Sequence, residues 1–215
     1  ITLSAITKDN ILTSSEEVGY DVSLILDVTG SMQGSVNGKA KYIAMVNTVN
    51  EAIKKLMNTN SKNRVSVTIY STTSKVIMPL ARYKTTGQYL EYAAAGTNGY
   101  DVPTIFVLSK TKATTSVDVN YDPVKVSGAT YTQLGIKVGA NVLANSTDTT
   151  NFPAIILLTD GYPTVWSQNY TNPTTSNHTG KHFGSVTGSV MGYHMILSAN
   201  HFKQKVKNAY DKKVR

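Results

Sequence analysis

Side chains that carry oxygen recur at every second position after the first long apolar run of the chain. The run Val22–Leu26 ends at Asp27, and Thr29 and Ser31 follow. In a loop that turns sharply at Gly30, the carboxylate and the two hydroxyls can converge on one point. Hard oxygen ligands with few carboxylates suit Mg²⁺ or Mn²⁺ better than Zn²⁺, which prefers nitrogen and sulfur. The spacing predicts a site for a divalent cation.

A second acidic residue follows another apolar run. Ala154–Leu158 leads into Thr159, Asp160 and Gly161. Ligands of parallel α/β sheets gather at the carboxyl ends of the strands, so we expect Asp27 and Asp160 to meet there. Each carboxylate ends a buried run and therefore requires a cationic or hydrogen-bonding partner.

Other chemistries fit these residues less well. A phosphatase of the haloacid dehalogenase type needs a second acid two residues after Asp27, and Thr29 stands there. The glycines at 30, 34 and 38 are not followed by the Gly-Lys-Ser/Thr of a phosphate-binding loop. A serine hydrolase needs a histidine partner, and none lies near Ser31 in the sequence.

Two further features remain open. His178 and His182 have a spacing that could bind zinc on a helix, but their surroundings are rich in Thr, Asn and Pro, which favours a surface loop. Trp166, the single tryptophan, either packs a surface segment onto the domain or lines a ligand surface.

Strands are predicted to alternate with helices along most of the chain. Helical spacing begins at Lys39 and recurs from Thr132 to Leu143 and near the C-terminus, where Ile196, Phe202 and Val206 share a stripe. Extended runs are predicted at 22–26, 65–69, 75–80 and 154–158, with a hairpin turn at 71–74. This order predicts an α/β fold, with a doubly wound, mostly parallel sheet flanked by helices.

Two long polar ranges, 84–127 and 162–188, interrupt this pattern. The first contains a short helix near Tyr89–Ala95 and two strand-like pieces, Thr104–Leu108 and Ser116–Tyr121. Loops of this length are commonly functional. We expect both ranges to be surface arms whose deletion leaves a folded domain.

Composition narrows the class of protein. The 215 residues include no cysteine, which excludes disulfides and thiolate metal sites. The net charge of +8 arises largely near the C-terminus, without the alternating aromatics of a nucleic-acid surface, so we expect no nucleic-acid partner. No apolar run is long enough to insert into a membrane. The abundance of Thr, Ser, Asn, Tyr and Gly is typical of an extracellular surface protein.

Three blocks in order resemble the von Willebrand factor type A domain, also called the integrin I domain. They are the strand leading into Asp27-x-Thr29-x-Ser31, the segment Gly128–Thr132, and the strand leading into Thr159-Asp160-Gly161. The resemblance covers residues 20–215, with 84–127 and 162–188 as insertions and 1–19 as a lead-in.

The resemblance implies a role for each site residue. Thr29 and Ser31 would bind the metal directly, and Thr130 directly or through water. Asp27 and Asp160 would act mostly through bound waters. The metal would be Mg²⁺, with Mn²⁺ and Ca²⁺ as alternatives, and an acidic group of a partner would complete its coordination. The domain would bind rather than catalyse. Thr132 is assigned to the start of a helix.

Within the family, the insertions and the lack of cysteine look most like tip adhesins of Gram-positive pili. That resemblance implies a location at the cell surface and cell wall. It also implies a host matrix protein or glycan as ligand, and a pilus backbone subunit as a partner of regions outside this sequence. The alternatives are a structural or assembly domain that contacts other subunits, and a metal-dependent hydrolase.

The resemblance also bears on the C-terminus. A complete type A domain has two further strand-helix units after the helix that follows the Asp160 strand, whereas this sequence stops after that helix, at Arg215. We therefore expect the domain to be incomplete, with its missing strands supplied by later sequence.

Overall fold

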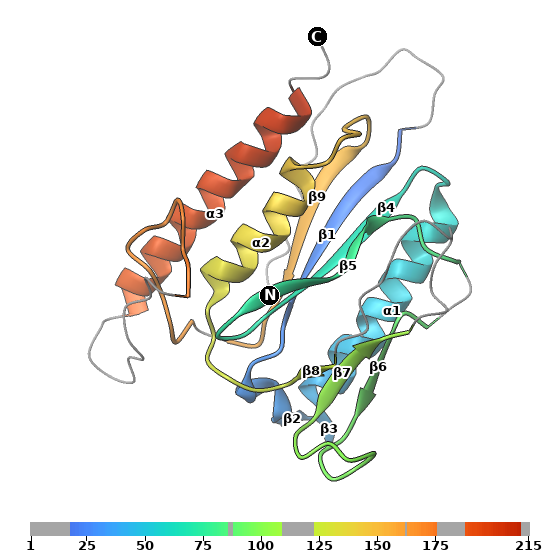
Figure 1. Cartoon of the computed structure of the whole chain (residues 1–215), viewed down its shortest axis with the longest axis vertical. Helices are drawn as coiled ribbons and strands as arrows, with labels where there is room; N and C mark the ends of the chain where they lie inside the picture. The colour runs from blue at the N-terminus through green and yellow to red at the C-terminus, as the bar shows by residue number, and fades with distance from the viewer. Residues whose placement is uncertain (1–17, 86–87, 109–122, 162, 176–187, 212–215) are drawn as a thin grey trace.

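A four-stranded sheet forms the centre of the protein. The computed structural model describes residues 18–85, 88–108, 123–161, 163–175 and 188–211. The strand order is β5-β4-β1-β9 (Figure 1). The bounds are β1 Tyr20–Asp27, β4 Arg64–Tyr70, β5 Ser74–Ala81 and β9 Phe152–Leu158.

The strand directions confirm the predicted mostly parallel sheet. β1 is parallel to both β4 and β9, and the hairpin of β4 and β5 supplies the antiparallel edge. The register places Asp27 opposite Tyr70 and Leu26 opposite Leu158. The carboxyl ends of β1, β4 and β9 therefore lie side by side. β9 lies at the other edge, and its side chains are half-buried.

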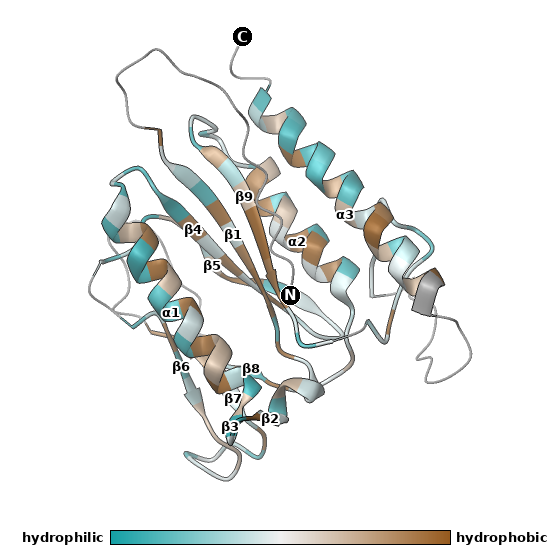
Figure 2. Ribbon diagram, turned by 180° about the vertical axis from the view of Figure 1, so that it is seen from behind, coloured by the Kyte–Doolittle hydropathy of each residue, from teal (hydrophilic) through white to brown (hydrophobic). Residues whose placement is uncertain are grey.

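Helices cover both faces of this sheet. α1 (Lys41–Thr59) lies on one face, and α2 (Thr132–Ala144) and α3 (Gly188–Asp211) lie on the other (Figure 1). Apolar bands on β1, β9, α1 and α2 line the interior in Figure 2, while the C-terminal half of α3 is mostly hydrophilic. The layers confirm the predicted doubly wound α/β architecture.

The central strand β1 is buried on both faces. Leu24 and Leu26 join the core beneath α1, whereas Ile25 points to α2. Ser23 also faces α2, and its hydroxyl donates a 3.0 Å hydrogen bond to the carbonyl of Gly139. This two-sided burial explains why β1 reads as an apolar run rather than as an alternating strand.

Two glycines bring α2 close to the sheet. A Cβ atom at Gly135 would lie 2.7 Å from the ring of Tyr70, and one at Gly139 would lie 2.6 Å from Ile25. The two positions are four residues apart and therefore lie on the same face of the helix.

The apolar stripe of α3 differs from the prediction at one position. Phe202 and Val206 are buried, as the predicted stripe required, and they pack with α2 residues, but Ile196 is 57% exposed. Met195 and Tyr210 belong to the packed face instead. The face that meets α2 begins one residue earlier than the sequence spacing suggested. Lys203, Lys205 and Lys207 are exposed, so this part of the positive charge faces solvent.

The range 84–127 contains a second, three-stranded sheet of β6 (Leu90–Ala93), β7 (Thr104–Val107) and β8 (Val124–Lys125). The helix predicted near Tyr89–Ala95 is wrong, because Leu90–Ala93 form a strand that pairs with β7 instead. The strand predicted at Thr104–Leu108 is confirmed, and Ser116–Tyr121 lies outside the described residues.

This second sheet shares the core beneath α1. Tyr89, Leu90 and Ile105 are buried in the same cluster as the α1 residues. The side-chain oxygen of Asn50 accepts hydrogen bonds from the backbone of Tyr89 and Leu90, at 3.0 and 2.8 Å. Deleting the range would expose this surface of α1, so the expectation of a dispensable appendage does not fit the structure.

The loop after β1 contains structure that the sequence pattern did not predict. A 3₁₀ helix, η1 (Gly30–Gln33), is followed by a small hairpin of β2 (Ser35–Val36) and β3 (Lys39–Ala40).

In the described part of the chain, no helix has the length and apolar character needed to cross a membrane.

Candidate metal centre

Asp27 is fully buried where β1 ends. Its Oδ1 accepts a 2.9 Å hydrogen bond from the backbone amide of Thr29, and its Oδ2 accepts bonds from Tyr70 (3.0 Å) and Thr159 (2.8 Å). Burial is the main cause that raises the pKa of Tyr70, and the charge of the Asp27 carboxylate raises it further. The phenol therefore stays protonated and donates its hydrogen bond to Asp27. Among the described residues, the donors to Asp27 are all neutral. A buried carboxylate with neutral partners favours a cation nearby.

Thr29 and Ser31 bring their hydroxyls together beyond Asp27. Thr29 is extended, and the 3₁₀ turn that follows places its Oγ1 3.0 Å from the Oγ of Ser31. The turn closes through hydrogen bonds from Met32 to the carbonyl of Thr29 and from Gly34 to that of Ser31. The predicted convergence occurs, but the 3₁₀ turn produces it, without a positive φ at Gly30.

Asp160 joins this group from the end of β9. Its Oδ1 accepts a 2.8 Å hydrogen bond from the Ser31 hydroxyl, across 129 residues of sequence. Its Oδ2 lies 2.7 Å from the ammonium of Lys41, the first residue of α1. Asp27 and Asp160 therefore meet at the carboxyl edge of the sheet, as their positions at strand ends predicted.

Thr130 lies on a third loop beside the first. The carbonyl of Gly128 accepts a 3.1 Å hydrogen bond from the amide of Gly30, which fixes the two loops together. Thr130 is 6% exposed, and its amide donates to the hydroxyl of Thr164 at 2.9 Å. Thr132 is the first residue of α2, as predicted.

The oxygen spacing fits a small octahedral cation. Adjacent ligands at the Mg–O distance of about 2.1 Å are about 3.0 Å apart. The Thr29–Ser31 and Ser31–Asp160 oxygen pairs are separated by 3.0 and 2.8 Å. The hydroxyls of Thr29 and Ser31 could thus occupy neighbouring coordination positions, with the Asp160 carboxylate next to Ser31 and Asp27 behind them. Within the described ranges, no group of three or more His, Cys, Asp or Glu side chains is placed to hold a metal ion, so hydroxyls would have to supply part of the coordination.

The candidate centre opens to solvent on one side. Asp27 and Thr29 are buried, whereas Ser31 and Thr159 are exposed. A cation held here would be anchored from below by the sheet. Its outer side would remain accessible to water or to an acidic group of another molecule.

Sequence patterns did not identify several residues around the centre. Tyr70 and Thr159 hold Asp27, and Lys41 pairs with Asp160. The adjacency of Thr159 to Asp160 could have suggested it, but Tyr70 and Lys41 reach the site only through strand register and helix placement.

The other two candidate features have different outcomes. Trp166 is 5% exposed and stacks on His194 of α3 at 4.7 Å, so it packs its segment onto the domain. The pair His178 and His182 lies outside the described residues.

The chain belongs to the von Willebrand factor type A domain family, whose model matches residues 22–162. The matched range contains all five proposed metal residues, and it also contains strand β9. Comparison with curated protein sequences returns no match.

Comparison with solved structures finds several pilus proteins, of which PilB has a similar fold. The PilB minor pilin from Streptococcus sanguinis is 17% identical with a TM-score of 0.59, over 91% of this chain and 49% of the pilin. The vWF domain of the type V pili tip protein Mfa5 from Porphyromonas gingivalis is 18% identical with a TM-score of 0.47, over 80% of this chain and 47% of Mfa5. The pilus adhesin RrgA from Streptococcus pneumoniae is 21% identical with a TM-score of 0.45, over 74% of this chain and 22% of RrgA. The chain thus spans about half of the first two structures.

Proposed function

We propose that this chain is a metal-ion-dependent adhesion module. Thr29, Ser31 and Thr130 would contribute hydroxyls to a bound Mg²⁺ or Mn²⁺, and Asp27 and Asp160 would contribute charge, largely through water. The observation that carries the proposal is the line of oxygens from Thr29 through Ser31 to Asp160, beside a buried carboxylate whose described partners are neutral.

The low number of carboxylates suggests how the module binds. A divalent cation held mainly by hydroxyls keeps much of its positive charge. Its solvent-facing side would accept a carboxylate from a partner, such as an acidic group of a host matrix protein or glycan. In this proposal the domain binds a partner and performs no catalysis, and the protein acts at a bacterial surface, where PilB is a minor pilin.

A second function rests on the same comparison. A minor pilin is a subunit of a larger assembly, so the metal site could instead hold a neighbouring subunit. The two functions differ in the partner rather than in the metal chemistry. Metal-dependent self-association in analytical ultracentrifugation would favour assembly, whereas metal-dependent retention on immobilised matrix proteins or glycans would favour adhesion.

Isothermal titration with MgCl₂ and MnCl₂ tests the metal site. Wild-type protein should bind a metal ion, and Ser31→Ala should weaken binding by about tenfold or more, because it removes one ligand. Ser35→Ala, at an exposed serine of β2, is the matched control. Asp27→Ala should abolish binding, with circular dichroism to verify that it is folded. A folded wild-type protein that binds neither metal would refute the proposal.

A further inference from the structure

An ammonium group already occupies one side of the candidate metal centre. Lys41 Nζ lies 2.7 Å from Asp160 Oδ2, with side-chain exposures of 31% and 9%. The other oxygen of Asp160 accepts the Ser31 hydroxyl. Both oxygens of this carboxylate are therefore engaged, one by a hydroxyl of the site and one by a cation that belongs to the chain.

The backbone fixes Lys41 beside the centre. Its amide donates a 2.9 Å hydrogen bond to the carbonyl of Gly34, directly after the 3₁₀ turn that carries Ser31. The lysine side chain crosses Gly34 closely, since a Cβ atom there would lie 3.7 Å from Lys41 Cε. Any movement of the turn on binding a metal would therefore also displace Lys41.

The position is electrostatically unfavourable for a lysine without a partner. Lys41 begins α1, where the helix dipole places partial positive charge, and the first turn contains no acidic residue. The carboxylate of Asp160 compensates for this, and a second cation at that carboxylate would remove part of the compensation.

We propose that Lys41 is a tethered cation that competes with the metal for Asp160 and sets the affinity of the site. The inference rests on the proposed metal-binding function and extends it to regulation. The two site carboxylates carry two formal negative charges, and the ammonium of Lys41 offsets one of them. The metal is therefore bound more weakly, and the filled site keeps a net positive charge that favours an acidic ligand.

A purely structural ion pair would behave differently. Removing a partly exposed pair changes stability slightly and leaves metal affinity unchanged. Competition predicts the opposite pattern, in which losing the ammonium strengthens metal binding. Metal affinity, measured directly, separates the two roles.

The test is calorimetric titration of MgCl₂ and MnCl₂ into wild type, Lys41→Met and Lys41→Gln at one pH and one ionic strength. Both variants should bind metal about tenfold more tightly than wild type. Lys39→Met, at an exposed lysine two residues earlier, is the matched control and should change the affinity less than twofold. Thermal unfolding in EDTA and in saturating Mg²⁺ provides a second readout, since metal should raise the Tm of Lys41→Met more than that of wild type.

The outcomes separate this inference from the function on which it rests. If wild type binds metal and the folded Lys41 variants bind it equally or less tightly, the competition is refuted while the metal site stands. If wild type and both folded variants bind no metal, the proposed function fails and the inference fails with it.

Discussion

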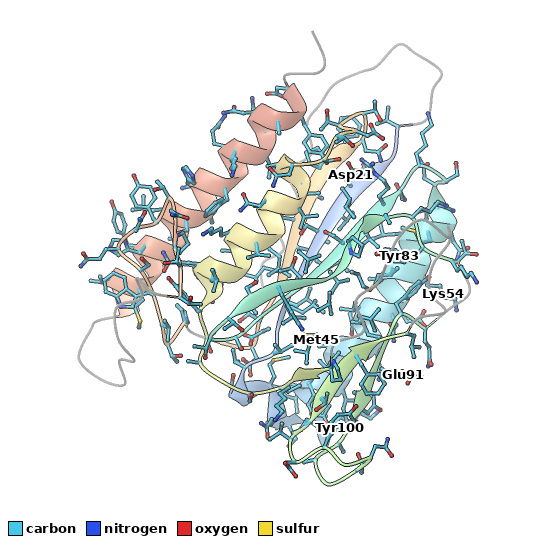
Figure 3. The ribbon with its side chains drawn as sticks, in the orientation of Figure 1. Asp21, Met45, Lys54, Tyr83, Glu91 and Tyr100 are labelled. Carbon is cyan, nitrogen blue, oxygen red and sulfur yellow. The ribbon has the colours of Figure 1, made fainter. Side chains whose placement is uncertain are left out.

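The phenol of Tyr210, at the end of α3, donates a 2.6 Å hydrogen bond to Oδ2 of Asp21, near the start of β1. Asp21 is fully buried and also forms a two-point ion pair with Arg64, at 2.8 and 2.6 Å. Asn151 completes the cluster by donating to Oδ1 at 2.9 Å. Figure 3 places Asp21 near the start of β1, whereas the candidate metal centre begins at Asp27, where that strand ends. The cluster ties α3 to three strands or their flanking loops.

Asp21→Ala is expected to lower the free energy of unfolding by about 3 kcal/mol or more, because it leaves the Arg64 guanidinium without its main partner. Tyr210→Phe removes one hydrogen bond and should cost about 1–2 kcal/mol. Urea unfolding followed by circular dichroism measures both. Lys207→Ala, which breaks the exposed pair with Asp211, should cost less than about 0.5 kcal/mol. An Asp21 variant as stable as this control would contradict the prediction.

Gly139→Ala is expected to destabilise the domain by about 1–3 kcal/mol, because the new methyl group would meet Ile25 at 2.6 Å. Gly192→Ala in α3 is the matched control. No atom lies within 4 Å of its added Cβ, so it should stabilise the protein by about 0.5–1 kcal/mol. Denaturant midpoints of the two variants should therefore shift in opposite directions, and shifts of the same sign would contradict the packing of α2 on β1.

Gly128→Ala is expected to weaken metal binding by about tenfold, because it disturbs the loop that is bonded to Gly30. Its φ is +94°, and an added Cβ would lie 2.9 Å from the Thr72 hydroxyl. Gly99 also has a positive φ, with no atom near its added Cβ, so Gly99→Ala is the control for backbone strain alone. Calorimetry should show unchanged metal affinity for the control. Equal affinities in both variants would argue against a role for the Gly128 loop.

Alkaline pH should destabilise the protein through its buried tyrosines. Burial raises the pKa of Tyr83 above the ordinary value of about 10, so the folded state keeps the phenol neutral. Its contribution is complete below about pH 10. It is lost at higher pH by about 1.4 kcal/mol per pH unit, because the unfolded chain ionises there.

Tyr83→Phe isolates this contribution. Urea unfolding of both proteins from pH 7 to about pH 11.5 should show a constant difference in stability up to about pH 9, which serves as an internal control. Above about pH 10 the stability of the variant should fall less steeply than that of wild type. Parallel curves over the whole range would show that folding does not raise the pKa of Tyr83.

Much of the candidate centre could be predicted from local pattern. Thr29 and Ser31 follow Asp27 at a fixed spacing, and both Asp27 and Asp160 end apolar runs. In a parallel sheet, strand ends of this kind meet at one edge, so topology brings the carboxylates together without any knowledge of side-chain packing. The order of strands and helices could also be predicted, because hydrophobic periodicity is itself a local pattern.

The sequence by itself determined the order of the strands and helices around the central sheet, and it placed Asp27, Thr29, Ser31 and Asp160 at strand ends, because these features follow from short-range spacing. Thr130 was assigned from the resemblance to the family instead. Only the tertiary structure decided that Lys41 pairs with Asp160 and that Tyr210 reaches Asp21. It also decided that Leu90–Ala93 form strand β6, which pairs with β7 and packs beneath α1. Such contacts depend on strand register and on the rotation of each helix about its axis, and no local pattern encodes either.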